Sequence, residues 1–417
     1  MSEVTEWLLH SFTHSLTYSL LLKMLNRRTL RIKVMQALYA YHQAVASDFS
    51  LANDQIADAF APDLSSPEPQ DRRKLQGQRK LAEVVLKEWY KSGEEPEKGD
   101  DADVYGAVQD AIKYYQKAVA KDANFYGGQM IHAAESIHDQ YLHLLNIPEV
   151  LLQVIEEDKA RAARKHIASA EPLLDTTRLE ENQAIQKLIS NTQLQALTIR
   201  RSQQWHGEEE MEALRGAWRN EMRQDPEIIS YLAAPAGNYA EDQEMLKHIF
   251  KSYVFKGESL PRYIEEDDLN WEENRSIVKN LVLKTVKMLD EAATEELELM
   301  SLSANWTEDK EFAESLYKQT LADDDKYEKL IADSVQNWDV ERVALTDKIL
   351  LKMALCEMHL FRGIPVKVTI NEYIEISKIY STPKSKQFVN GILDKLAQDL
   401  TASGAIRKSG RGLLDNQ

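Results

Sequence analysis

Apolar residues recur at spacings of three and four along nearly the whole chain, and this periodicity constrains the fold more than any other feature. Alternating apolar and polar runs, which indicate strands, are short and rare. A helix needs the three-to-four spacing to place its apolar side chains on one face. The sequence therefore predicts an all-α fold, in which a first long helix runs from Leu25 to about Ala46.

Length and charge limit the classes of protein that this chain can belong to. The chain has 417 residues, of which 43% are hydrophobic, enough for two or three folded domains. A formal charge of -17 argues against a surface that coats nucleic acid everywhere, because phosphates attract concentrated Lys and Arg. The single cysteine, Cys356, excludes an internal disulfide and favours a reducing compartment, the cytoplasm.

The first 23 residues lack the pattern of a targeting segment. Glu3 and Glu6 stand where a secretory signal carries positive charge, and no run reaches the roughly 20 apolar residues that span a bilayer. We therefore expect no signal peptide and no membrane role. Either Met1 or Met24 can be the true start, and in the second case residues 1–23 are an upstream extension.

Changes in composition divide the chain into six parts. Loop-like Pro-rich and acidic stretches, APDLSSPEPQ and SGEEPEKGDDAD, flank a helix predicted near Leu75–Tyr90. Further helices are predicted at Ile137–His166 and Arg178–Arg201. The six parts are an N-terminal extension (1–23), a basic helix (24–46), an insertion (47–128), a helical middle region (129–304), a C-terminal core (305–400) and a basic tail expected to be disordered (401–417).

The first helix concentrates positive charge. Arg27, Arg28, Arg31 and Lys33 lie within seven residues, and no acidic residue occurs from Met24 to Gln43. Arg28 and Tyr39 are eleven residues apart and so share nearly one direction around the helix, with Arg31 on the same side. Guanidinium groups pair with phosphates and aromatic rings stack on bases, which suits single-stranded RNA. The alternative is a solvated basic helix with a core tyrosine.

A second candidate segment, STPKSKQF, lies near the C-terminus. Thr382 or Ser381 is the predicted helix cap, with Pro383 in the first turn. Lys384 and Lys386 then lie at a helix N-terminus, which attracts phosphate, and Phe388 offers a stacking face. The alternative is that Phe388 joins Ile392 and Leu396 in the core.

Two separated regions resemble the NusB transcription-antitermination family. They are MLNRRTLRIKVMQALYAYHQ at residues 24–43, and the region from KEFAESLYKQTL through QNWDVERVALTDKILLKMALCEMHLF to Leu400. The segments IPVKVTINEYIEISKIY and STPKSKQFVNGILDKL carry the most specific likeness. The resemblance implies a NusB-like helical bundle, here with extra helices inserted between the first helix and the C-terminal core.

The resemblance also implies a function, which is to bind a boxA-like single-stranded leader RNA together with the ribosomal protein NusE. That complex resembles the one that keeps RNA polymerase elongating through ribosomal RNA operons. The implied RNA-binding residues are Arg27, Arg28, Arg31, Lys33, Gln36, Tyr39, Lys384, Lys386 and Phe388. Lys384 departs from the acidic residue expected there, which puts the RNA preference in doubt.

The helix predicted at Val340–Phe361 resembles the family's surface for NusE. Its acidic residues suit a basic ribosomal protein, although a solvated charged face is the alternative for most of them. The expected partner-binding residues are Asp339, Glu341, Asp347 and Glu357.

Enzyme signatures are absent from the sequence, which has no Walker-type loop, no GxSxG, no HExxH and no cysteine pair. We therefore expect no enzyme activity, cofactor or metal, and we interpret His10, His14, His132, His138 and His143 as surface or core histidines. Two other functions stay open. One is a module acting with a ribosomal RNA methyltransferase, whose catalytic part this chain lacks, and the other is a protein-interaction scaffold without RNA binding.

Overall fold

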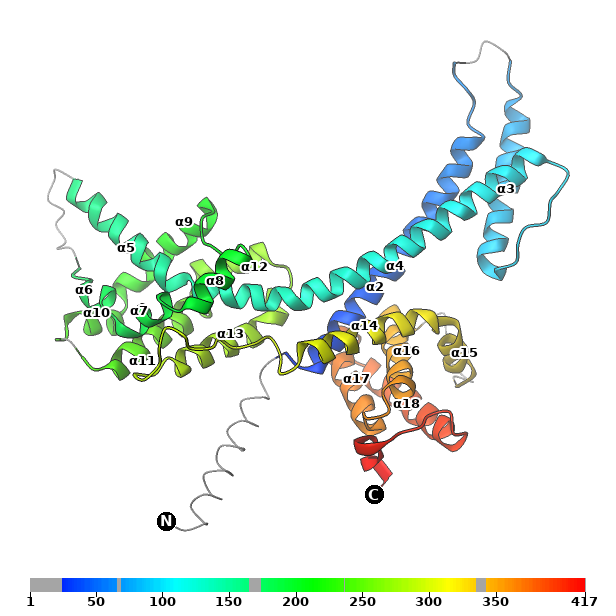
Figure 1. Ribbon diagram of the computed structural model, residues 1–417. Helices are drawn as coiled ribbons and strands as arrows, with labels where there is room; N and C mark the ends of the chain where they lie inside the picture. The colour runs from blue at the N-terminus through cyan, green and yellow to red at the C-terminus, as the bar shows by residue number, and fades with distance from the viewer. Residues whose placement is uncertain (1–24, 66–68, 165–173, 236, 335–342, 417) are drawn as a thin grey trace. The chain divides into compact units, whose positions relative to one another are not determined.

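The computed structural model describes residues 25–65, 69–164, 174–235, 237–334 and 343–416, and within these ranges the chain forms helices and no strand (Figure 1). The all-α prediction is confirmed. Contacts divide the chain into two compact units, one built mainly from residues 133–307 and the other from residues 28–132 and 308–417. The predictions for residues 1–23 fall outside the described residues.

Short helices make up the first unit, whose residues 133–307 overlap the region 129–304 that the sequence predicted to be helical. Its core includes the fully buried Ile137, Leu142, Leu246 and Leu281. The last part of α4 (Ala102–Leu145) belongs to this unit. The other helices are α5 (Ile147–Arg164), α6 (Thr177–Glu180), α7 (Gln183–Ile189), α8 (Thr192–Arg200), α9 (Glu208–Gly216), α10 (Pro226–Ala233), α11 (Tyr239–Ile249), α12 (Ser259–Asp267) and α13 (Trp271–Met288), with π-helical turns at Ala217–Glu221 and Phe250–Val254 and a 3-10 turn at Met222–Gln224.

Asparagines interrupt the two long helices that the sequence predicted in this unit. The expected helix over 137–166 breaks at Asn146, whose side chain donates to the Leu142 carbonyl at 2.9 Å. The expected helix over 178–201 is three helices, because the Asn182 and Asn191 side chains cap α7 and α8 by accepting the N–H groups of Ile185 and Leu194. Asparagine side chains compete with helical hydrogen bonds in this way. The helices therefore end at positions across which the apolar periodicity of the sequence continues.

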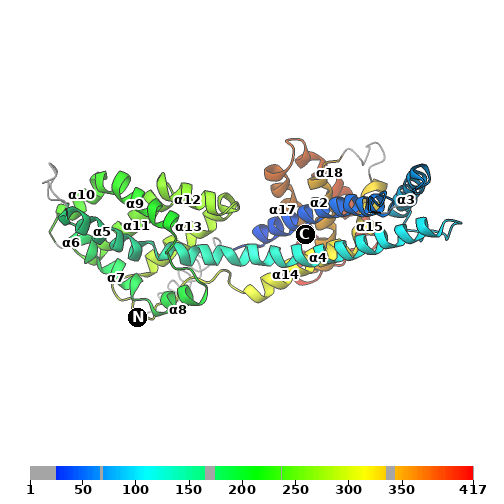
Figure 2. The same cartoon turned by 90° about the horizontal axis from the view of Figure 1, so that it is seen from above.

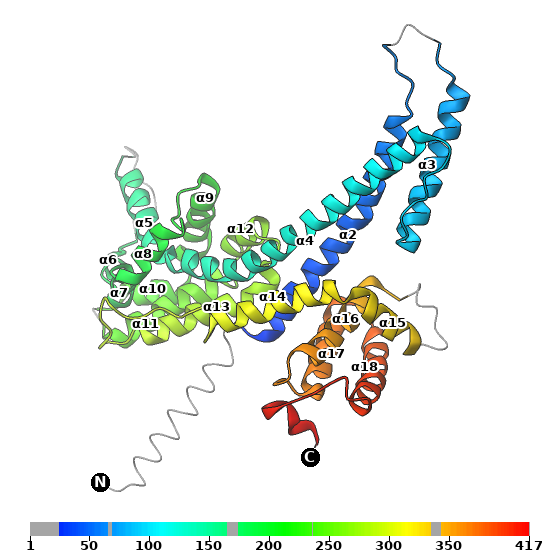
Figure 3. The same cartoon turned by 45° about the vertical axis from the view of Figure 1, so that its right-hand side comes forward.

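The second unit contains the C-terminal segment that resembles the NusB family and, from Arg28 onward, the N-terminal one (Figures 2 and 3). Around α16, α17 and α18 it forms a helical core, in which residues 349–358 of α16 are all buried. The helices are α2 (Arg27–Ala59), α3 (Arg72–Ser92), the first part of α4, α14 (Trp306–Ala322), α15 (Asp324–Ser334), α16 (Leu345–Leu360), α17 (Val366–Tyr380) and α18 (Ser385–Ala402), followed by a 3-10 segment (Gly410–Asn416).

The first helix of this unit, α2, continues beyond the predicted end at Ala46. No Pro or Gly interrupts it before Ala59, and Ala52, Ile56 and Phe60 keep the apolar spacing. These residues form a second core with α3 and the start of α4, in which Ala82 and Leu86 of α3 are fully buried. We call residues 49–115, which contain this core, the arm.

The ends of α3 explain why the predicted insertion contains a fixed helix. The Asp71 carboxylate accepts the N–H groups of Arg73 and Lys74 at 3.0 and 3.1 Å, which caps the N-terminus. At the other end Gly93 adopts a left-handed φ of 71°, a conformation that favours glycine. The helix predicted at Leu75–Tyr90 therefore exists and is longer than expected.

The C-terminal tail is more ordered than the sequence suggested. Ile406 is 5% exposed, the Ser409 N–H donates to the Arg362 carbonyl at 3.1 Å, and the Lys408 Nζ donates to the Phe361 carbonyl at 3.0 Å. One apolar side chain and two hydrogen bonds attach this segment to the end of α16, a contact between distant residues that a basic, Gly-rich composition does not reveal.

Candidate functional site

The basic start of α2 is divided between exposed and buried side chains. Arg28 and Tyr39 are each 43% exposed, and both lie on the helix face that the sequence predicted. Arg31 and Lys33, by contrast, are 3% and 2% exposed. Arg27 and Gln36 are half-buried and have interactions of their own.

A buried ion pair accounts for Arg31. Its Nε and Nη2 atoms each donate to an oxygen of Glu357 in α16 at 2.7 Å. Thr369 and Tyr373 of α17 donate to the same carboxylate at 2.9 and 3.1 Å, and Phe312 lies 5.4 Å from the guanidinium. Burial by itself would lower the pKa of Arg31, but the hydrogen bonds and charge of Glu357 raise it above its ordinary value. Arg31 therefore fastens α2 to the core.

Arg28 pairs with a different carboxylate at the surface. Its Nε and Nη2 donate to Glu372 of α17 at 2.8 and 2.7 Å. Burial would raise the pKa of Glu372, but the hydrogen bonds from Arg28 and the charge of Arg31 hold it below its ordinary value. Because the Arg28 side chain stays 43% exposed, it can exchange this carboxylate for a phosphate, while Arg31 cannot without leaving the core.

The second predicted segment forms the start of α18, although the helix begins later than expected. Lys384 occupies the cap position and Ser385 begins the helix, whereas the sequence predicted a cap at Ser381 or Thr382. The buried Ser385 hydroxyl donates to Asp347 at 2.6 Å, which ties the start of α18 to the start of α16. Lys384 and Lys386 are exposed.

The burial of Phe388 is intermediate between the exposed stacking face and the core residue that the sequence left open as alternatives. Phe388 is half-buried and has contacts of its own, while Val389, Leu393 and Leu396 form the core-facing stripe of α18. Ile392, the expected core neighbour of Phe388, is also half-buried. Phe388 is therefore partly accessible, two and four residues along the chain from the exposed Lys386 and Lys384.

The acidic residues expected to bind a partner have different surroundings from those predicted. Asp339 and Glu341 lie outside the described residues. Asp347 is 5% exposed and Glu357 is fully buried, and both accept hydrogen bonds from within the unit, from Ser385 and Arg31 respectively. The two carboxylates hold α18 and α2 at points ten residues apart on α16, or about 15 Å along its axis.

The sequence did not predict several residues that hold the site in position. Glu372, Thr369 and Tyr373 complete the Arg28 and Arg31 interactions, and all three lie in IPVKVTINEYIEISKIY, the segment whose family likeness was a usable signal. Lys352, 6% exposed, binds Asp324 at 2.8 Å and so connects α16 with α15. The sequence signal for Lys352 was a lysine within an otherwise apolar run.

The histidines of α4 have structural partners. His138 contacts the Met300 carbonyl at 3.1 Å, and burial lowers its pKa. His143 stacks on Trp205 with ring centroids 4.6 Å apart. Among the described residues no cluster of His, Cys, Asp and Glu is suited to hold a metal, and none of the helices described is long and apolar enough to cross a membrane.

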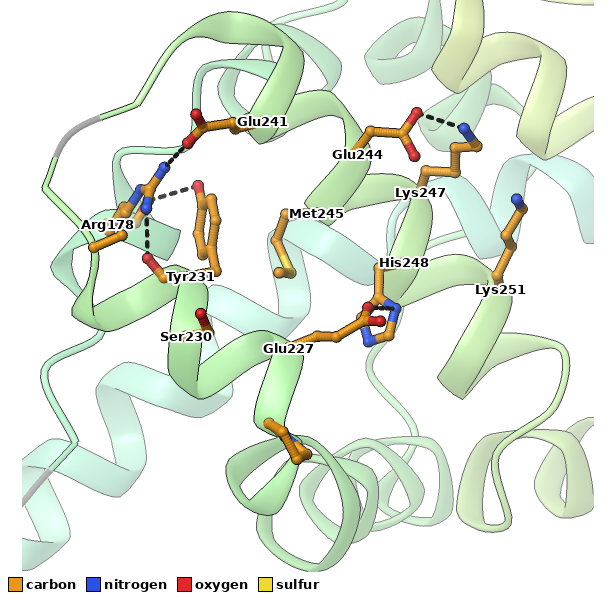
Figure 4. Close-up of a pocket in the computed structure, with 12 residues that line it drawn as sticks. Arg178, Glu227, Ser230, Tyr231, Glu241, Glu244, Met245, Lys247, His248 and Lys251 are labelled. Carbon is orange, nitrogen blue, oxygen red and sulfur yellow. Dashed lines mark hydrogen bonds and ion pairs between the residues drawn. The ribbon is translucent and has the colours of Figure 1, made fainter.

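A cavity of about 640 Å³ lies in the first unit, where no site was predicted (Figure 4). Arg178 stacks on the Tyr231 ring 4.1 Å away and pairs with Glu241 at 2.6 Å, and His248 lies 2.7 Å from Glu227. The charges of this wall therefore largely compensate one another, and the cavity favours neither an anion nor a cation.

Comparison with known proteins relates the second of the two family-like regions to one family. The family model for the NusB family matches residues 274–398. Among curated proteins, three named transcription antitermination protein NusB are similar. The protein of Salinibacter ruber is 42% identical over 105 residues, which are 25% of this chain and 66% of that protein. The protein of Chloroherpeton thalassium is 49% identical over 85 residues, 20% and 40% of the two chains, and that of Thermodesulfovibrio yellowstonii is 40% identical over 90 residues, 22% and 60%.

The extent of these matches defines what they establish. The chain spans between 40% and 66% of the length of these relatives, and the matched residues are a quarter of this chain or less. No solved structure matches the chain. The matched region contains α16, α17 and most of α18, which form the helical core described above. The C-terminal region of this chain is therefore a NusB family domain, carried by a chain that is longer than ordinary members of the family.

Proposed function

We propose that this chain is an RNA-binding transcription antitermination factor that binds a boxA-like single-stranded leader RNA together with NusE and so supports transcription of ribosomal RNA operons. One observation carries the proposal. Arg28 and Tyr39 are exposed on one face of α2, and the buried Arg31–Glu357 pair fixes that helix to the NusB family domain. A phosphate-binding group and a stacking ring are thereby held in a constant relation.

The start of α18 supplies the second part of the proposed RNA surface. Lys384 and Lys386 are exposed beside the half-buried Phe388. The segment is attached to one end of α16 through Asp347, and α2 is attached near the other end through Glu357. In this proposal Arg31, Lys33, Asp347 and Glu357 act as positioning residues and do not touch RNA.

NusE is the proposed protein partner, on the strength of the family likeness and the acidic character of the chain, whose charge is -17. A basic ribosomal protein is attracted to such a surface. RNA and NusE should each strengthen the binding of the other, because each organises surface for the other. An RNA affinity that does not change on adding NusE would contradict this coupling.

The test is binding of a labelled boxA-like RNA to the full chain at fixed salt, with and without NusE. Tyr39→Ala should weaken binding about 5- to 150-fold, because stacking contributes about 1–3 kcal/mol per base. Tyr39→Phe should retain the affinity, since the ring remains. Lys384→Gln/Lys386→Gln should reduce the salt dependence of the RNA affinity. The matched control is Lys318→Gln, which replaces an exposed lysine of α14 that pairs with Glu314.

The second candidate is a protein-interaction scaffold without RNA binding. The observation that favours it is the burial of Arg31 and Lys33, which removes two of the four predicted cations from the surface of α2. Docking of NusE with no RNA affinity in its presence or absence would support the scaffold and overturn the RNA-binding proposal.

A further inference from the structure

Among the helices that the structure describes, α3 concentrates positive charge most clearly on its outer face. It lies in the arm, outside the NusB family domain. Seven of its 21 residues are Lys or Arg and two are Glu, which leaves a formal charge of +5. In the whole chain 51 of 417 residues are Lys or Arg, and the net charge is -17. Such a local excess in an acidic protein needs a physical explanation beyond solubility.

Four of these residues form a single row. Arg73, Lys80, Lys87 and Lys91 are spaced by seven, seven and four, so they fall within about 40° of one another around the helix. They lie opposite Ala82, which is buried in the arm core, and all four are exposed. The row is about 27 Å long at the helical rise of about 1.5 Å per residue.

The charges of this row are not compensated by neighbouring carboxylates. Arg79, on the flank of the helix, pairs with Glu83 at 2.7 Å. Within the part of the chain that the structure describes, none of the four residues of the row makes an ion pair, although an acidic loop follows the helix at once. The six carboxylates of residues 94–103 therefore do not neutralise the row.

The row is also held rigidly. Asp71 and Gly93 cap the two ends of α3. Leu86 packs in the arm core, and Gln78 donates to Asp101 at 2.8 Å, which joins α3 to the start of α4. The helix cannot turn its basic face inward, since its apolar face is already occupied. A fixed line of exposed, unpaired cations is a surface for a polyanion.

We propose that this row binds the phosphate backbone of RNA that flanks the boxA-like element, as a second, sequence-independent RNA contact. The inference rests on the proposed RNA-binding function and extends it to a separate part of the same unit. Lysines act as point charges toward phosphates. Val84 is the apolar residue within the row, and Leu81 and Tyr90, which are also exposed, lie about 80–100° away around the helix. A protein interface needs aromatic or aliphatic anchors at its centre. A membrane would need the apolar face that the arm core occupies.

The distance between the start of α2 and the arm determines how long an RNA must be to contact both. Arg28 and Ala52, where the arm core begins, are 24 residues apart on the same continuous helix, or about 36 Å. A short boxA-like oligonucleotide bound at the start of α2 does not cover that distance. Stacked nucleotides rise about 3.4 Å each, so an extension of about 20 nucleotides spans about 68 Å and is long enough to reach the row.

The experiment compares the boxA-like RNA alone with the same RNA extended by about 20 nucleotides on each side, using the full chain over a range of salt concentrations. The α3 variant replaces all four residues of the row with Gln. The matched control replaces four exposed cations that already pair with nearby carboxylates. These are Arg262, Lys318, Lys326 and Lys378.

We expect the wild type and the control to bind the extended RNA at least tenfold more tightly than the short one. The α3 variant should lose this difference while keeping its affinity for the short RNA. Its salt slope on the extended RNA should fall by up to about 3, because each single-strand phosphate contact contributes about 0.7. An unchanged circular dichroism melt shows that the variant folds, as the four side chains are exposed.

Other outcomes separate this proposal from the proposed function. If the α3 variant binds the extended RNA as wild type does, with the same salt slope, the row does not contact RNA. If the wild type binds both RNAs equally, the same conclusion follows, and an acidic protein becomes the partner to seek. If the wild type binds the extended RNA through the row but does not bind the short RNA, the boxA proposal falls and the α3 contact stands.

Discussion

Two basic helices of the same unit direct their charges in opposite ways. At the start of α2, Arg31 and Lys33 are buried, and Arg31 forms an ion pair with Glu357. On α3, Arg73, Lys80, Lys87 and Lys91 are exposed and form no ion pair among the described residues. Local charge therefore does not reveal function by itself. In α2 part of the charge assembles the domain, and in α3 it remains available to an external anion.

The largest expected effect is on the buried ion pair of α2. Glu357→Ala should lower the free energy of unfolding by about 3–5 kcal/mol, because the buried Arg31 guanidinium loses its bidentate carboxylate and keeps only Glu372, at 3.6 Å. Urea denaturation followed by circular dichroism measures the change. Replacing both partners, as in Arg31→Met/Glu357→Leu, should recover most of the loss. A loss below about 1 kcal/mol for Glu357→Ala would mean that α2 is not held by this pair.

The arm core should be independent of the family core. Leu86→Ala should cost about 2–5 kcal/mol locally, because it leaves a cavity among fully buried residues of α2, α3 and α4. Hydrogen exchange should rise in α3 and the C-terminal half of α2 but not in α16. Faster exchange in α16 as well would show that the two cores unfold together and would weaken the contrast between them.

Arg28 should contribute far less to stability than Arg31. Arg28→Ala should cost about 0.2–1 kcal/mol at neutral pH, since the Arg28–Glu372 pair is partly exposed. The pKa of Glu372 lies below 4.5 in the folded chain, so its contribution is complete above pH 4.5 and is lost as pH falls through the folded value. The stability difference between wild type and variant should therefore be constant from pH 7 to 5 and narrow below pH 4.5. A difference that grows on acidification would contradict the assignment.

The smallest expected effect is on the row of α3. Lys80→Gln and Lys87→Gln should each change the free energy of unfolding by less than about 0.5 kcal/mol, because both side chains are exposed on the solvent face of a capped helix. Thermal melts of the two variants measure this. A destabilisation above about 1 kcal/mol would mean that the row serves the fold, as Arg31 does, and not a ligand.

The candidate site shows which parts of such a surface can be anticipated. That Arg28 and Tyr39 share one face of α2 follows from their spacing of eleven residues, and in the structure both side chains are exposed. The burial of Arg31 could not be foreseen in this way, because it lies only about 60° from Arg28 around the helix and its partner is 326 residues distant in sequence. Asp347 and Glu357 likewise looked like a charged surface, but their hydrogen-bond donors lie on other helices.

The sequence by itself determined the helical fold class, the NusB-like character of the C-terminal region and the positions where positive charge collects, because periodicity, motifs and composition are local properties. It also contained the capping residues that divide the middle region, Asn182 and Asn191, although apolar spacing obscured them. Only the tertiary structure decided which cations face inward and which carboxylates pair with them. Those outcomes depend on which distant helix packs against each face, where the desolvation of a charge is offset by a partner that local sequence does not specify.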